Sequence, residues 1–144
     1  MQVHQILRSK PQASVITVKP GSTVADAARL LSERRIGAVI VSADGKTPIG
    51  ILSERDIVRD VGRRGGDCLN EKVEGLMTQN LVSCAPDDNT DDVLAKMTSG
   101  RFRHMPVVDG GGMVGIISIG DVVAARISEL AMEKEALAGM IMGN

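Results

Sequence analysis

The sequence predicts a mixed α+β fold in which two β-α-β-β-α units pack sheet to sheet around a pseudo-two-fold axis. The first observation behind this prediction is an internal repeat, because residues 16–58 and 82–123 show the same order of features. The second is periodicity, since each repeat combines short apolar runs with a helical apolar stripe. The third is size: 144 residues suit one small body, and one unit alone has too little core.

Matched positions define the repeat. Most of the first copy aligns with the second at a shift of 66 positions, and its last part aligns at 65 because the glycine-rich loop loses one residue. The identities are Pro20 with Pro86, Asp26 with Asp92, Arg35 with Arg101, Val41 with Val107, Gly45 with Gly111, Gly50 with Gly115, Ile51 with Ile116, Ser53 with Ser118 and Asp56 with Asp121. Together with the shared order of elements, they indicate a duplicated unit.

Each repeat is predicted to run strand, helix, strand, strand, helix. Thr23 and Asn89 suit the start of the first helix, and each is followed three positions later by a carboxylate, Asp26 or Asp92. A glycine-rich turn then joins two strands. A Ser-x-x-Asp segment opens the second helix. The predicted strands are 15–18, 38–41 and 49–52 in the first repeat and 81–84, 105–108 and 114–117 in the second.

The predicted domain boundaries follow the repeat. Residues 1–61 form the first repeat with its lead-in, 62–72 a polar linker, 73–127 the second repeat and 128–144 a C-terminal helical extension. The pattern over 121–142 is one long helix with more apolar positions than a small core needs. Two interpretations stay open for it: a helix that packs back on the body, or a surface that contacts a second copy or another protein.

Composition argues against several classes of function. A net charge of −1, with one Phe and no Trp or Tyr, disfavours direct nucleic-acid binding. No apolar run is long enough to span a membrane and the first residues do not resemble a signal peptide, so we expect a cytoplasmic protein without membrane contact. Cys68 and Cys84 are expected to be free thiols, with no metal site. No catalytic set of residues is recognisable, so we do not expect an enzyme.

The repeated motifs resemble those of the cystathionine-β-synthase (CBS) domain pair, also called a Bateman module. Residues 35–41 (RIGAVIV) and 50–56 (GILSERD) carry the resemblance in the first repeat, and 101–109 (RFRHMPVVD) and 115–121 (GIISIGD) carry it in the second. Leu76-Met77-Thr78 leads into the second repeat, with Ile6-Leu7-Arg8 as the counterpart ahead of the first. The resemblance covers about residues 1–127.

The resemblance implies a non-catalytic regulatory module with an adenosine-containing ligand in two clefts between the repeats. AMP and ATP are the ligands expected first, with ADP, NAD(H) and S-adenosylmethionine as further candidates, and no other cofactor is expected. The aspartate of Ser-x-x-Asp would accept hydrogen bonds from the ribose hydroxyls. Cleft A would combine Ala13, Ile16, Ile36, Gly37, Ala38, Ser118, Gly120 and Asp121. Cleft B would combine Ser53, Arg55, Asp56, Thr78, Leu81, Phe102, Arg103 and His104.

Several alternatives stay open. Asp56 and Asp121 suit the first turn of a helix without any ligand. Arg103 and His104 match positions that often contact phosphate in the family, whereas Gly37 and Ala38 stand there in the first repeat, so the clefts are not equivalent. The resemblance also implies a flat, disk-like homodimer, and the regulated protein partner is unknown. A different class of function is a structural or interaction protein with vacant clefts, acting through dimerisation or its C-terminal helix.

Overall fold

The computed structural model describes residues 1–10 and 15–142. Its elements are α1 (Val3–Ser9), β1 (Thr17–Val18), α2 (Val24–Arg34), β2 (Ala38–Val41), β3 (Gly50–Ser53), α3 (Glu54–Arg64), α4 (Thr90–Gly100), β4 (His104–Asp109), β5 (Gly112–Ser118) and α5 (Ile119–Ile141), with 3-10 turns at Gly66–Asn70 and Val73–Gly75. The mixed α+β class and the two-repeat architecture predicted from the sequence are confirmed.

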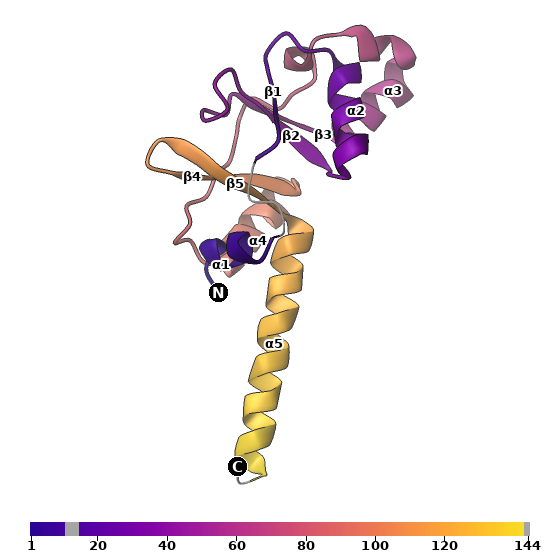
Figure 1. Ribbon diagram of the computed structural model, residues 1–144. Coiled ribbons are helices and arrows are strands. Elements are labelled where there is room, and N and C mark those ends of the chain that lie inside the picture. Colours follow the sequence, from indigo (N-terminus) through magenta and orange to yellow (C-terminus); the bar gives the residue numbers. More distant parts are fainter. Residues whose placement is uncertain (11–14, 143–144) are drawn as a thin grey trace.

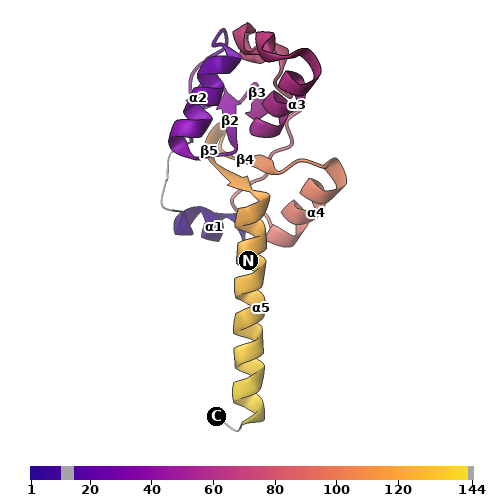
Figure 2. The ribbon, with the colours of Figure 1, turned by 90° about the vertical axis from the view of Figure 1, so that its right-hand side faces the viewer.

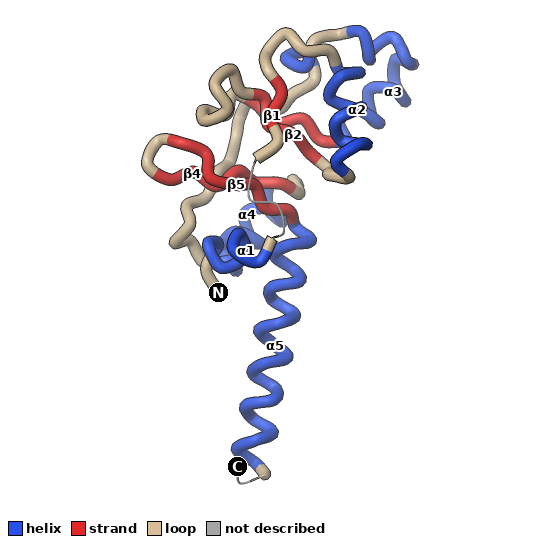
Figure 3. The backbone as a smooth tube through the Cα atoms, in the orientation of Figure 1, coloured by secondary structure: helices blue, strands red, loops and turns tan. Residues whose placement is uncertain are grey.

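Two small sheets face each other in the middle of the body (Figure 3). In the first half β1 pairs in parallel with β2, and β2 pairs antiparallel with β3. In the second half β4 and β5 form a hairpin whose two loop residues, Gly110 and Gly111, have φ of 61° and 87°. Such positive φ values at both positions suit glycine and the right-handed twist of a hairpin. Helices α2 and α3 cover one outer side, and α1 and α4 cover the other (Figure 1).

The predicted strand over 81–84 is wrong except at its last residue. The Leu81 N–H closes a tight turn onto the Gln79 carbonyl at 2.9 Å, so the chain bends there instead of extending. Only Cys84 pairs with the sheet, donating to the Pro106 carbonyl at 3.0 Å and accepting from the Val108 N–H at 2.8 Å. In the first half the predicted strand over 15–18 is limited to Thr17–Val18.

Reciprocal capping fixes where three of the helices begin. Thr23 accepts from the Asp26 N–H, and Asp26 accepts from the Thr23 N–H. Ser53 with Asp56 and Ser118 with Asp121 form the same box at α3 and α5. At α4 Asn89 is the N-cap and Asp92 lies in the first turn, as predicted, but the Asn89 side chain accepts from the N–H two residues later, at 2.8 Å.

The two lead-in segments pack on opposite halves of the molecule. Val3 and Ile6 of α1 lie in the core of the second repeat, together with Met105 and Val107. Val73 lies in the core of the first repeat. The domain boundaries proposed from the sequence follow chain order, whereas the packing gives each repeat the lead-in that precedes the other one.

The same main-chain hydrogen bonds hold both lead-ins. The Val3 N–H donates to the Asp88 carbonyl at 3.0 Å, and the Val73 N–H donates to the Ser22 carbonyl at 2.8 Å. In the reverse direction, Thr90 N–H donates to Met1 O at 3.0 Å and Val24 N–H donates to Glu71 O at 2.8 Å. The pseudo-two-fold relation therefore extends beyond the repeats to the segments in front of them.

Two glycines make room for these lead-ins. A methyl group at Gly50 would lie 2.3 Å from Sδ of Met77, and one at Gly115 would lie 2.6 Å from Cδ2 of Leu7. Both contacts are far shorter than van der Waals distance. The aligned glycines of the repeat thus mark where each strand is crossed by a lead-in side chain.

Residues 62–72, the predicted linker, contain helical turns. Helix α3 continues to Arg64, and the following 3-10 turn buries Cys68. Helix α5 begins on the second half, where Val122 is buried, and then extends well away from the body (Figures 1 and 2). The interpretation that this helix packs back on the body is therefore correct only for its first turns.

Candidate functional site

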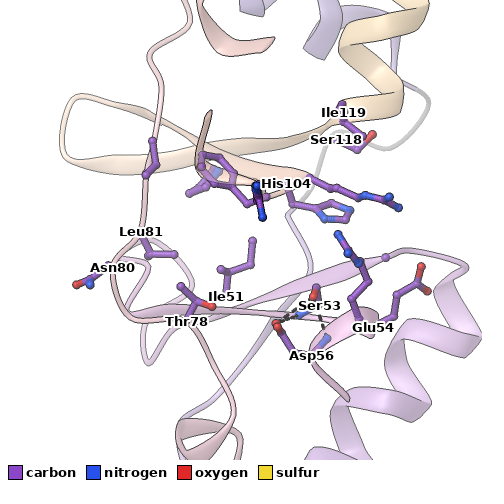
Figure 4. A pocket seen from close by; sticks show the side chains of 18 of the residues that line it. Ile51, Ser53, Glu54, Asp56, Thr78, Asn80, Leu81, His104, Ser118 and Ile119 are labelled. Carbon is purple, nitrogen blue, oxygen red and sulfur yellow. Dashed lines mark hydrogen bonds between the residues drawn. The ribbon is translucent and has the colours of Figure 1, made fainter. Parts of the chain in front are cut away.

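Cleft B lies between the two sheets and has a volume of about 520 Å³. In Figure 4, Ser53, Asp56 and Thr78 lie on one wall and His104 and Ser118 lie on the other. The main chain of Thr78 is fixed by paired hydrogen bonds with Ile51, at 2.9 and 3.0 Å. The residues predicted for this site all line it: Ser53, Arg55, Asp56, Thr78, Leu81, Phe102, Arg103 and His104. The structure brings these residues together, and their contact with a ligand stays a prediction.

Asp56 both caps a helix and faces cleft B. Its Oδ2 accepts from the Ser53 N–H at 3.0 Å and from the Ser53 hydroxyl at 2.9 Å. Its Oδ1 lies 3.7 Å from Nη1 of Arg59, which is beyond hydrogen-bonding distance. Asp56 therefore stabilises the first turn of α3, as the interpretation without a ligand expects. The cap uses only Oδ2, so Oδ1 is available to accept a hydrogen bond from a ligand hydroxyl group.

Cleft A lies on the other side of the axis and has a volume of about 600 Å³. Six of the residues predicted for it line it: Ile16, Ile36, Gly37, Ala38, Ser118 and Asp121. Gly120 does not line this cavity, since the cap turns the first residues of α5 so that Ser118 and Asp121 face it. Ala13 lies outside the described residues.

Lys10 is the main feature of cleft A that the sequence analysis missed. Its ammonium group donates to Oδ2 of Asp121 and to the Ile116 carbonyl, both at 2.9 Å. Burial of Asp121 disfavours its charge, but the Ser118 N–H and the Lys10 ammonium outweigh burial and hold the pKa of this carboxyl below its usual value. The same oxygen also accepts from the Ser118 N–H at 2.9 Å. In cleft A the capping carboxylate is therefore already engaged by a cation.

His104 sits where the two clefts meet and lines both of them. A methyl group on Gly37 would lie 3.0 Å from Nε2 of this histidine, so the imidazole rests directly on the glycine backbone. Burial lowers the pKa of His104, although the carboxylates of Glu54 and Asp121 act in the opposite direction. His104 of the second repeat thus packs against Gly37 of the first repeat. A larger side chain at position 37 would crowd the imidazole, so the contact depends on the two repeats having different residues at these positions.

Cationic side chains surround both cavities. Arg59 and Arg101 join the predicted arginines of cleft B, and Arg8, Lys10 and Arg35 line cleft A. The repeat alignment carried a signal for one of them. A shift of 70 positions aligns Ile6 with Leu76, and the same shift places Lys10 on Asn80, which lines cleft B. Arg59, in the second turn of α3, gave no motif of its own. Arg35 and Arg101, which directly follow α2 and α4, belong to the repeated motifs but were not assigned to a cleft.

The described residues offer neither a metal site nor a membrane-spanning helix. Among residues 1–10 and 15–142 there is no cluster of side chains suited to a metal ion. No helix within these ranges is long and apolar enough to cross a membrane. Burial raises the pKa of the Cys84 thiol to about 11, so this cysteine is protonated at neutral pH and serves as a packing residue.

Comparison with known proteins identifies the repeat. The CBS domain family model matches residues 3–63 and again residues 73–128. The chain belongs to the CBS domain family. Each match spans one copy of the repeat, so the protein contains a pair of CBS domains, as the motifs indicated.

Solved structures of CBS domain proteins share the fold. The CBS-domain containing protein ATU1752 from Agrobacterium tumefaciens is 42% identical, with a TM-score of 0.83 over 88% of this chain and 99% of that one. PAE2072 from Pyrobaculum aerophilum, solved as a complex with AMP, is 26% identical, with a TM-score of 0.78 over 92% of this chain and 99% of that one. The CBS pair of MJ0100, in complex with 5-methylthioadenosine and S-adenosyl-L-methionine, is 25% identical, with a TM-score of 0.77 over 90% of this chain and 98% of that one.

Proposed function

We propose that this CBS pair is a non-catalytic regulatory module that binds an adenine nucleotide between its repeats. CBS pairs of the same fold take up AMP in one case and 5-methylthioadenosine with S-adenosyl-L-methionine in another. Those ligands share adenosine and differ in what is attached to its 5′ carbon. The proposal therefore rests on what this chain presents to the ribose and to the 5′ group.

One observation carries the proposal: a half-buried capping carboxylate faces each cleft beside a group of cations. Asp56 in cleft B and Asp121 in cleft A are each held by the serine three residues earlier, with their side chains 20% and 25% exposed. A fixed carboxylate can accept two hydrogen bonds from a vicinal diol. The surrounding cations favour a phosphate at the 5′ position over the sulfonium cation of S-adenosylmethionine. AMP, ADP and ATP fit this arrangement better than the uncharged or cationic adenosines, and NAD(H) is the next class to test.

Cleft B is the stronger site in this proposal. Among the described residues neither Asp56 Oδ1 nor Asp121 Oδ1 accepts a hydrogen bond, but Lys10 contacts Oδ2 of Asp121 at 2.9 Å, whereas the nearest cation to Asp56 lies 3.7 Å away. A ribose diol that uses both oxygens of Asp121 competes with the ammonium group for Oδ2, and this competition costs part of the binding free energy. We therefore expect AMP to fill cleft B first.

The regulatory part of the proposal follows from the position of the clefts. Each cavity has walls from both repeats, so a ligand that fits one relative placement of the repeats better than another shifts the balance between them. The repeats also touch at their hairpins, where the Met113 N–H donates to the Lys46 carbonyl at 2.9 Å. We expect a partner protein, as yet unknown, to recognise that placement. The cytoplasmic location expected from the sequence remains a prediction.

Isothermal titration calorimetry with AMP, ATP, NAD⁺ and S-adenosylmethionine tests the proposal. AMP or ATP should bind, and Asp56→Asn should weaken cleft B by about 10- to 150-fold, because a hydrogen bond to a charged group contributes about 1.5–3 kcal/mol. Asp121→Asn should affect the weaker site alone. Asp87→Asn removes an equal charge from an exposed position outside both clefts and should change nothing. Neither heat nor thermal stabilisation with any of the four ligands at millimolar concentration would refute a nucleotide-binding role.

A structural or interaction role is the second candidate function. The exposed apolar side chains of α5 favour it, since Leu137 and Ile141 are 60% and 81% exposed. Large apolar side chains that remain exposed in a group commonly mark a contact surface. This role does not depend on ligand binding, and both functions are compatible in one protein.

A further inference from the structure

Helix α5 uses only one of its faces to contact the body. Val122 is buried, Ala125 packs against the core of the second repeat, and the Glu129 carboxylate binds the amino group of Met1 at 3.0 Å. These residues follow the spacing of three and four that places side chains on one side of a helix. The body therefore accounts for that face and for the first three turns.

A second apolar stripe runs along a different face of the same helix. Its residues are Val123, Ile127, Leu130, Lys134, Leu137 and Ile141. Their spacing of four, three, four, three and four is a heptad repeat, and we call these six residues the heptad seam. At 3.6 residues per turn the seam lies roughly a third of a turn around the helix from the face that contacts the body. Its apolar members range in exposure from 42% for Val123 to 81% for Ile141.

The composition of the seam matches one kind of partner. In heptad notation Ile127 and Ile141 occupy a positions, while Leu130 and Leu137 occupy d positions. β-Branched residues at a with leucine at d favour two parallel strands. The e positions are all alanine (124, 131 and 138), which leaves the seam open to a close neighbour.

Lys134 is the single polar residue of the seam. A lone polar residue at an a position fixes the register and the number of strands of a coiled coil. In a parallel pair Glu133, at the preceding g position, lies beside the lysine of the other helix and offsets its charge. In an antiparallel pair the two Glu133 side chains would instead lie near each other, which is unfavourable. Charge and apolar pattern thus agree on a parallel copy of the same helix.

We propose that two copies of this chain associate through the heptad seam as a parallel two-stranded coiled coil. The CBS family model ends at residue 128, so most of the seam lies beyond the region that the family has in common. Such a contact also differs from a flat disk built from the helices of the repeats. The helix has 23 residues, and an interface of this length falls near or below the small end of specific interfaces, about 1,200 Å². We therefore expect a reversible dimer that depends on protein concentration.

Sedimentation velocity on the full chain across a wide concentration range, without ligand, tests the proposal. The double variant Ile127→Glu/Leu137→Glu should raise the dimer dissociation constant by about tenfold or more. Met132→Glu is the matched control, because Met132 is 56% exposed on the same helix but off the seam, and it should dimerise like the unmodified chain. Circular dichroism and thermal unfolding should show that both variants keep the fold, since neither change touches the face that packs on the body.

Cross-linking tests the parallel orientation. Lys134→Cys should form a disulfide-linked dimer on mild oxidation, because equivalent a positions face each other only in a parallel pair. Cys68 and Cys84 are buried, so they contribute little background, and Ser128→Cys, off the seam, should not cross-link. A monomer at every concentration would overturn the proposal and leave the seam to a helix of another protein. A dimer that survives the double variant, or that does not cross-link through position 134, would overturn it as well. These readouts need no nucleotide, so they are independent of the proposed function.

Discussion

Replacing Lys10 with methionine is expected to tighten adenosine binding in cleft A by about fivefold. In the free protein the ammonium group contacts Asp121 at 2.9 Å, and the two side chains are 27% and 25% exposed. The pair thus lies between surface ion pairs, which contribute about 0–1 kcal/mol, and hydrogen bonds to charged groups, which contribute about 1.5–3 kcal/mol. A cost of about 1 kcal/mol for competing with the ammonium group at Oδ2 of Asp121 corresponds to the fivefold change. Methionine keeps an unbranched side chain of nearly the same length and removes the ammonium group, with its bonds to Asp121 and the Ile116 carbonyl.

Calorimetric titration with adenosine measures this change. The titration is made on protein that also carries Asp56→Asn, so that cleft A supplies the stronger remaining site. Adenosine has no phosphate, so the loss of Lys10 as a phosphate partner does not mask the effect. Lys19→Met is the control, because Lys19 is exposed and lines neither cleft. Unchanged or weaker adenosine binding after Lys10→Met would show that the ion pair does not compete with the ribose, and the reasoning would fail.

Two further predictions concern stability. Gly50→Ala should lower the free energy of unfolding by about 1–3 kcal/mol, since its methyl group collides with Met77. Gly62→Ala lies in open space on α3 and should raise the free energy of unfolding by about 0.5–1 kcal/mol. Urea unfolding measures both changes, and equal effects of the two variants would contradict the packing argument. Because the folded pKa of His104 lies below its ordinary value of 6.5, the unfolded chain takes up this proton first, so stability should fall as pH drops from 6.5 toward the lowered pKa. His104→Asn should flatten that slope in thermal unfolding followed against pH, and an unchanged slope would assign it to other groups.

The elements that follow from local rules were predictable from the sequence. The capping boxes at Thr23, Ser53 and Ser118 were each signalled by a carboxylate three residues later, and the structure forms all three. Asn89 also caps its helix, but its amide oxygen accepts from the N–H two positions on, at 2.8 Å, so no reciprocal box forms there. The local pattern also predicted a strand at 81–84. The chain instead makes a turn at Leu81, and this segment lines cleft B.

Contacts between distant segments were not predictable in the same way. Because the lead-ins are exchanged, Val3 packs in the core of the second repeat with Val107, and Val73 packs in the core of the first repeat. No periodicity within either lead-in predicts which repeat it packs against. Lys10 reaches Asp121 across 111 positions of sequence, so only the alignment of lead-ins, continued for two more residues, could have suggested it. Predicted cleft residues within the repeats fared better, because the repeated motifs fix their place on the strands and helix ends.

The exchange of lead-ins has a consequence for how the chain is synthesised. Helix α1 is synthesised before the repeats, yet the strand residues that cover Val3 and Ile6, such as Met105 and Val107, follow about a hundred residues later. The first core, by contrast, is complete once Val73 has emerged. The earliest unit able to fold during translation therefore spans roughly residues 15–78, and α1 waits with its apolar side uncovered. Contacts between residues so far apart in the sequence slow folding. We therefore expect α1 to pack only after most of the second repeat has folded.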